Sequence, residues 1–247
     1  MRPNVIQIAE FESGSFPQAS FYIDACFLLA FLDQSSEEGE LVERVLQKLE
    51  KEDIDSLVIS NHVVSEVIHH LYLGNIYNVI YTAFRKFKLN RHLNENEEEL
   101  LGNNPFVAKK LMELVSPPQL NRMRTAQDVF IPVKEIIKAY KERYADRDSL
   151  SYYYEMAVER FNLLCSNLGE LFNIQFKHVA SDEQTFYFAQ EFMNELQLEI
   201  KDSLHLALAK QYKADYFATL DGDFIHNFYN EEHLEETTIL HISKRYI

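Results

Sequence analysis

The sequence predicts an α/β fold in which a central, mostly parallel sheet is flanked by helices and interrupted by an α-helical insertion. Strand and helix patterns alternate at both ends of the chain, whereas the stretch between about Gly74 and Phe172 carries helical patterns alone. Apolar residues make up 47% of the 247 residues, which is enough for a substantial core. We therefore expect an α/β domain built from residues 1–73 and 174–247, with a helical subdomain at 74–173.

The N-terminal part has the order strand, helix, helix, strand, helix. Short apolar runs predict the strands, and apolar residues at three- and four-residue spacing predict the helices. The expected elements are Phe21 to Asp24, Ala25 to Leu32, Glu37 to Lys51, Leu57 to Ser60, and His62 to Tyr72 with Asn61 as its cap.

The middle of the chain contains four helical patterns. They are Asn75 to Leu89, Phe106 to Val115 opened by Asn104 and Pro105, a stripe from Ala126 to Tyr144 kinked near Pro132, and a stripe from Ala157 to Leu171.

The C-terminal part returns to alternation. Ser181 and Gln184 form a capping-box pattern ahead of a helix. The expected elements are a strand from Ile174 to Val179, helices Glu183 to Leu196 and Ser203 to Gln211, a strand from Asp215 to Leu220, and an edge strand from Thr237 to Ile242.

Composition excludes several functional classes. The net charge of −15 argues against a simple nucleic-acid binder, although a bound divalent cation would reverse the charge locally. No apolar run approaches the roughly 18 residues that span a bilayer, and the N-terminus lacks the apolar region of a signal peptide, so we expect a cytoplasmic protein. Cys26 and Cys165 lie in apolar helical patterns, which favours reduced core thiols.

Acidic residues stand at the ends of apolar segments far apart in the chain. They are Asp24, Glu66, Asp202, and the pair Asp221 and Asp223. Because the carboxyl ends of parallel strands meet at one edge of a sheet, and helices can border that edge, these acids can converge on one cleft. Oxygen ligands favour hard cations such as Mg²⁺ or Mn²⁺, which activate water for phosphodiester hydrolysis.

Four segments carry a family resemblance: YIDACFLLAFL, SNHVVSEVIHHL, KDSLHLALAK and ADYFATLDGDF. Their order and elements resemble the PIN domain, the fold of VapC-type toxin ribonucleases and related RNA-processing nucleases. The resemblance covers roughly residues 20–73 and 174–243 and leaves the helical middle unmatched.

The resemblance implies a metal-dependent endoribonuclease, a hydrolase that leaves 5′-phosphate and 3′-hydroxyl ends. Asp24, Glu66, Asp202 and Asp221 match the family's acids in order, and Asp223 matches an additional acid. Ser60 and Thr219 match small hydroxyl positions that orient carboxylates. The biological setting implied is the toxin of a toxin–antitoxin pair or a defence nuclease, with RNA such as tRNA as substrate, an antitoxin or assembly partner, and a homodimer as a common state.

Simpler interpretations of these residues remain open. Asp24 and Asp202 can be helix caps, and Asp221 to Asp223 a turn. A second hypothesis is a catalytically silent PIN-like module that holds a protein partner through its helical insertion, and a third is a DNA-directed or structure-specific nuclease.

Histidines and basic residues offer further candidates. His62, Glu66 and His70 share a helix face that could hold a transition metal, whereas His205 and His226 are expected to be structural or close to substrate. Near His92, a cluster of Arg85, Lys86, Lys88 and Arg91 forms either a solvated helix face or a strip that contacts RNA.

Overall fold

The structure, a computed structural model, describes residues 4–102, 104–125, 130–225 and 229–243. It divides into two compact units, one of residues 1–67 and 163–247 and one of residues 68–162. The sequence-based boundaries were 73 and 174, so the structure places both limits of the central unit earlier in the chain.

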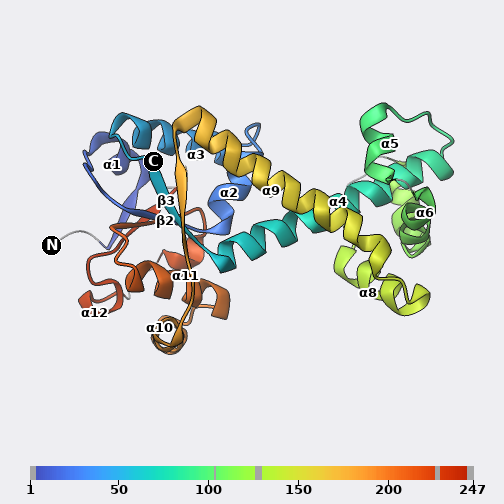
Figure 1. The fold of residues 1–247 in the computed structure, drawn as a ribbon. Helices are drawn as coiled ribbons and strands as arrows, with labels where there is room; N and C mark the ends of the chain where they lie inside the picture. The colour runs from blue at the N-terminus through green and yellow to red at the C-terminus, as the bar shows by residue number, and fades with distance from the viewer. Residues whose placement is uncertain (1–3, 103, 126–129, 226–228, 244–247) are drawn as a thin grey trace. The chain divides into compact units, whose positions relative to one another are not determined.

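The first unit is built around one parallel sheet (Figure 1). Its strands are β1 (Val5–Gln7), β2 (Phe21–Ile23), β3 (Ser56–Ser60), β4 (Gln175–Val179), β5 (Tyr216–Thr219) and β6 (Thr238–His241), in the spatial order β1-β6-β5-β2-β3-β4. Every pairing between these strands is parallel. The structure thus confirms the α/β class and the parallel sheet.

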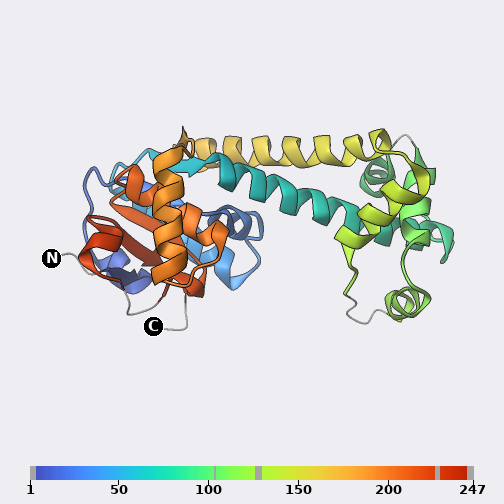
Figure 2. The same ribbon diagram turned by 90° about the horizontal axis from the view of Figure 1, so that it is seen from below.

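Helices cover both faces of this sheet (Figure 2). Helices α1 (Ile8–Ser13), α2 (Ala25–Leu32) and α3 (Glu37–Lys51) lie on one face (Figure 1). Helices α10 (Glu183–Glu195), α11 (Ile200–Gln211) and α12 (Glu231–Leu234) lie on the other, as right-handed crossovers require for this strand order. Strands β2 and β5 are buried along their whole length, as central parallel strands are when helices lie on both sides.

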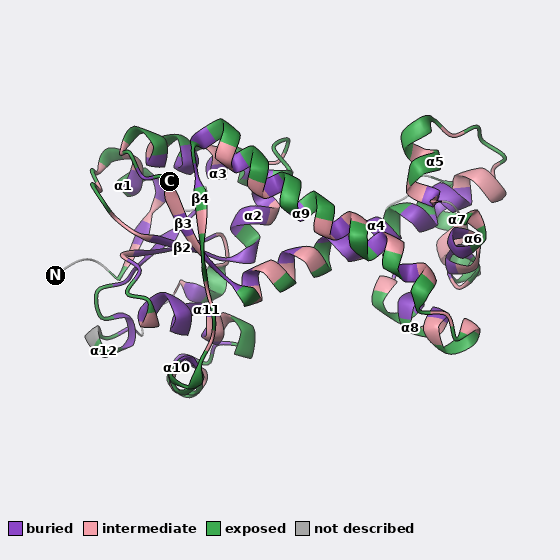
Figure 3. Cartoon of the chain, viewed as in Figure 1, coloured by how far each residue is buried: buried purple, intermediate pink, exposed green. Residues whose placement is uncertain are grey.

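The second unit is helical in its described part. It contains most of α4 (Asn61–Phe87) and part of α9 (Ser151–Phe172), with α5 (Glu95–Leu101), α6 (Pro105–Glu113), α7 (Pro117–Arg124), α8 (Val133–Tyr144) and the short 3-10 helix η1 (Asp148–Leu150) between them. Buried residues recur along α4 at the spacing that its apolar pattern predicts, and Figure 3 colours the chain by burial. The amide of Asn75 is also buried: it donates to the Tyr153 carbonyl at 3.2 Å and accepts from Arg160 at 3.1 Å, which ties α4 to α9.

Several predicted elements were wrong in detail. Helix α4 is one helix of 27 residues, where the sequence suggested two helices separated at Gly74. The stripe predicted from Ala126 to Tyr144 does not form one helix. Helix α8 begins after Pro132, which is its N-cap, and Phe130 is 82% exposed. Residues 126–129 lie outside the described residues. Helices α5 and α7 were missed because they are short and carry few apolar residues.

The sheet and one cap also differ from expectation. Strand β6 is an inner strand because β1, which the sequence did not reveal, pairs with its outer side. Asp182 caps α10 by accepting from the Thr185 N–H at 3.0 Å, in place of the predicted Ser181 and Gln184. Both cysteines are free, as predicted, but Cys26 is exposed and Cys165 is half-buried, so neither is a core thiol.

No helix in the described part of the chain combines the length and apolar character that crossing a membrane requires.

Candidate metal centre

Strand order brings the predicted acids to one edge of the first unit. The chain leaves β2 for β3 and β4 on one side, and later adds β5 and β6 on the other side, so the direction of strand addition reverses at β2. Such a reversal opens a crevice outside the carboxyl ends of the strands that flank it. Asp24 directly follows β2, and Asp221 is the second residue after β5.

Asp24 is a buried helix cap with an additional partner. Its Oδ1 accepts from the Phe27 N–H at 2.9 Å, which caps α2, and its Oδ2 accepts from the Thr219 hydroxyl at 2.5 Å. Burial raises the pKa of this carboxyl, against the lowering effect of its hydrogen bonds. The cap interpretation of Asp24 is therefore correct, and the carboxylate also binds Thr219 at the end of β5.

Thr219 also fixes the turn that follows β5. Its hydroxyl oxygen accepts from the Asp221 N–H at 2.9 Å, and Asp221 Oδ1 accepts from the Asp223 N–H at 2.9 Å. Asp221 is the N-cap of the 3-10 helix η2 (Gly222–Phe224), so the turn interpretation is also correct. One hydroxyl thus links the buried carboxylate after β2 to half-buried Asp221 and, through it, to exposed Asp223 after β5.

Three carboxylates converge beside this turn. Asp202, in the first turn of α11, brings a carboxylate oxygen that lies within 4.8 Å of oxygens from Asp221 and Asp223. Burial, and next the charge of Asp221, raise the pKa of Asp202 to about 6. Convergent anions of this kind match the oxygen ligand set of Mg²⁺ or Mn²⁺, and a cation there would offset their repulsion.

Glu66 faces a different set of partners. Its Oε2 lies 3.3 Å from His205 Nε2, and its Oε1 accepts from the Lys201 ammonium at 3.1 Å. The hydrogen bond from His205 is the main reason why the pKa of Glu66 is lowered to about 2, with a further contribution from Lys201. Glu66 is therefore an ionised carboxylate next to the cluster and is not one of its three members.

A buried hydrogen-bond chain stands behind Glu66. The Tyr22 hydroxyl donates to Ser60 Oγ at 2.9 Å and lies 2.9 Å from His205 Nδ1. Ser60 was expected to orient a carboxylate directly, but in these contacts it binds Tyr22 and the Val63 N–H, so its effect on Glu66 passes through His205. The roles of Tyr22 and Lys201 were missed. The signal for Lys201 was its spacing of four residues from His205 on one helix face.

The other histidine candidates do not form the predicted transition-metal set. His62 lies on the same helix as Glu66, but its Nε2 is 2.5 Å from the Ser181 hydroxyl. Neither His62 nor His70 belongs to a group of close metal-ligating atoms among the described residues. His226 lies outside the described residues.

The basic cluster is partly neutralised. Arg85 forms an ion pair with Glu97, and Lys86 forms one of 2.6 Å with Glu98, both on α5. Lys88 and Arg91 are exposed. The sequence did not reveal these pairs, because their partners are 12 residues apart and lie on different helices. The pairs leave fewer unpaired basic side chains to contact a phosphate backbone.

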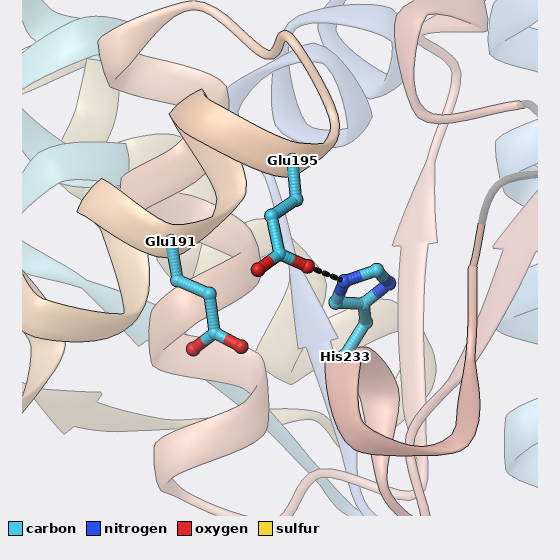
Figure 4. Close-up of side chains that lie close together, drawn as sticks. All are labelled: Glu191, Glu195 and His233. Atoms are coloured by element: carbon cyan, nitrogen blue, oxygen red, sulfur yellow. Dashed lines mark hydrogen bonds and ion pairs between the residues drawn. The ribbon is translucent and has the colours of Figure 1, made fainter.

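A second group of metal-ligating side chains, Glu191, Glu195 and His233, is better explained as a contact between α10 and α12 (Figure 4). His233 Nδ1 accepts from the Asn230 N–H at 3.2 Å, so the ring proton is on Nε2, which lies 2.6 Å from Glu195. If Nε2 bound a metal ion, the ring proton would have to move to Nδ1. There it would point at the Asn230 N–H, and two donors would face each other. The group is therefore the capped start of α12 with a hydrogen bond from His233 to Glu195.

No protein-family model, curated protein or solved structure matches this chain.

Proposed function

We propose that this chain is a PIN-type endoribonuclease that depends on Mg²⁺ or Mn²⁺. The observation that supports the proposal most strongly is the convergence of Asp202, Asp221 and Asp223 within 4.8 Å at the sheet edge where the strand order reverses. Asp24 joins this edge through Thr219, and Glu66 borders it.

Each residue would have a defined task. Asp202, Asp221 and Asp223 would hold the cation, and Thr219 keeps Asp24 and Asp221 in register. A bound divalent cation would supply activation of water and stabilisation of the leaving oxygen. His205, held by Tyr22, fixes Glu66 as a negative charge beside the cluster. These side chains would orient RNA and water, and the products would carry a 5′-phosphate and a 3′-hydroxyl.

The proposal sets the enzyme in the cytoplasm, where RNA is present and free thiols such as Cys26 and Cys165 stay reduced. An antitoxin or other assembly partner would regulate it there, so the protein must be purified free of partners before assay.

RNA cleavage tests the proposal. Total RNA is incubated with the wild type, Asp202→Asn and Asp221→Asn in Mg²⁺ or Mn²⁺, and product ends are mapped. We expect both variants to lose at least a hundredfold in rate, since each removes a ligand from a three-carboxylate cluster. Glu191→Gln is the matched control, because it removes an acid from the other group and should cleave normally.

Two results would contradict the proposal: a wild type that cleaves no RNA with either metal, and an Asp202→Asn variant that cleaves at the wild-type rate. Binding of Mn²⁺ without cleavage would instead favour the catalytically silent module.

A further inference from the structure

Lys201 holds a distinct position at the acidic edge. It directly precedes Asp202 in the first turn of α11, and its Nζ donates to Glu66 Oε1 at 3.1 Å. The side chain keeps 67% of its surface exposed, so the ammonium is held at one end and open to solvent elsewhere. An ammonium has three donors, and Glu66 accepts from one of them.

The partner of Lys201 is itself held in place. The second oxygen of Glu66 is bound by His205, whose side chain is 4% exposed. The other ring nitrogen of His205 lies 2.9 Å from the fully buried Tyr22 hydroxyl. Glu66 is therefore anchored from the core side, and its outer oxygen presents a fixed point for Lys201.

Stability does not explain this arrangement well. An exposed lysine–glutamate pair contributes only about 0–1 kcal/mol to folding, because water and salt screen it and because the long side chain loses freedom. The position of the pair, next to Asp202, points instead to a role in binding.

Charge identifies what Lys201 would bind. The chain carries a net charge of −15, and three carboxylates converge at this edge, so an RNA phosphate approaches against repulsion. In the predicted basic cluster, Arg85 and Lys86 are already paired with Glu97 and Glu98. Lys201 places a positive charge where the acids are.

We propose that Lys201 is a substrate-binding residue that contacts a phosphate of RNA, with Glu66 holding its ammonium at the acidic edge. The inference rests on the proposed nuclease function and adds to it the residue that receives the RNA backbone. A lysine is suited to this task, since its ammonium binds phosphate as a compact point charge.

The salt dependence of RNA binding tests this role. A fluorescein-labelled 20-nucleotide oligouridylate is titrated with full-length Asp24→Asn protein in Mn²⁺, at several salt concentrations, and gel analysis checks that it stays intact. Adding Lys201→Gln should weaken binding about three- to fivefold at 0.15 M salt. It should also reduce the slope of log K against log salt by about 0.7, the value for one phosphate contact with a single strand.

Two further variants separate this role from simpler effects. Lys201→Arg keeps the charge and should retain the slope. Lys213→Gln makes the same change in charge beyond the opposite end of α11 and should leave both affinity and slope unchanged.

The inference is overturned if Lys201→Gln leaves the slope unaltered, if Lys213→Gln reduces it equally, or if the parent protein does not bind the RNA. Loss of the nuclease assignment is a separate result, because it depends on cleavage by the wild type. Cleavage by the wild type together with an unaltered Lys201→Gln slope would remove only the role of Lys201.

Discussion

Thr219 shows how a single hydroxyl organises carboxylates from two strands. It donates to Asp24 and accepts from the Asp221 N–H, and its side chain is fully buried. Strand register makes this geometry natural, because Ile23 and Ala218 are paired and Asp24 and Thr219 are the next residues.

Replacing Thr219 by valine should destabilise the protein by about 1–3 kcal/mol, since the Asp24 carboxylate and the Asp221 N–H would lose a buried partner without a change in side-chain shape. Urea denaturation measures the loss. Thr219→Ser keeps the hydroxyl and should recover most of the stability. Equal stability of the valine variant and the wild type would show that the bond is not important.

Asp202 should make metal-free stability depend on pH in an unusual direction. Its pKa in the folded state, about 6, lies above the ordinary value of 3.8, so the carboxyl favours folding while protonated and loses that contribution as pH rises from about 4 through 6. Allowing for its partial exposure, Asp202→Asn should therefore stabilise the protein at pH 7.5 by about 1 kcal/mol, with the difference gone by pH 4.

Thermal unfolding in EDTA at pH 4 and 7.5 measures this difference. A variant that is less stable than the wild type at pH 7.5 would mean that Asp202 already has a favourable partner.

The sequence identified the acids of the candidate site better than their surroundings. Asp202, Asp221 and Asp223 were predictable because acids stood next to apolar elements in a parallel order. The partners of Glu66 were not, because Lys201 and His205 lie 135 residues or more away, and their four-residue spacing shows only that they share a helix face, not that Glu66 faces them.

At the scale of elements, helix α4 shows that a single glycine is a poor predictor of a helix end. Gly74 suggested a break, yet the helix continues through it to Phe87. A glycine lowers helix stability by roughly 1 kcal/mol relative to alanine, and the packed stripe formed by Ile76, Val79, Ile80 and their neighbours outweighs that cost.

Gly74→Ala should stabilise the protein by about 0.5–1 kcal/mol, because no heavy atom lies within 4 Å of the position that the new Cβ would occupy. Chemical denaturation with a two-state fit gives the change. Gly39→Ala, in α3, is the contrasting variant. The new Cβ would collide with the backbone oxygens of Asp33 and Ala30, so this substitution should destabilise the protein. Destabilisation by Gly74→Ala would contradict the open environment.

Two helices were predicted with their exact bounds, whereas one short strand was missed. Helices α2 and α3 have the predicted bounds, since their apolar spacing extends over two or more turns. Strand β1 has three residues and pairs along one side, so its sequence carries almost no periodic signal. Its position was therefore set by the partner strand β6 and not by local preference.

At the scale of the whole molecule, topology and charge act together. The parallel strand order collects acids that the sequence distributes over 200 residues, and a net charge of −15 gives the protein little to offset them. A divalent cation that binds only the folded state should thus stabilise it through mass action.

Mn²⁺ at about 100 times its dissociation constant should add roughly 2.7 kcal/mol, which corresponds to a rise of several degrees in Tm. A thermal-shift titration of the wild type measures this rise. Asp221→Asn should reduce it strongly, whereas Glu191→Gln should preserve it. A wild-type Tm that does not respond to Mn²⁺ would contradict a metal centre at this edge.

The bond between Asp24 and Thr219 also has a consequence for the timing of folding during synthesis. The two residues are 195 positions apart, and strand β2 pairs directly with β5. A ribosome adding about 5–20 residues per second needs roughly 10–40 s between them. During that interval β2 has no β5 beside it, and Asp221 and Asp223 do not yet exist. A nascent chain of this protein therefore lacks the carboxylate cluster until residues 221–223 have been added, so any activity that depends on the cluster begins only after that point.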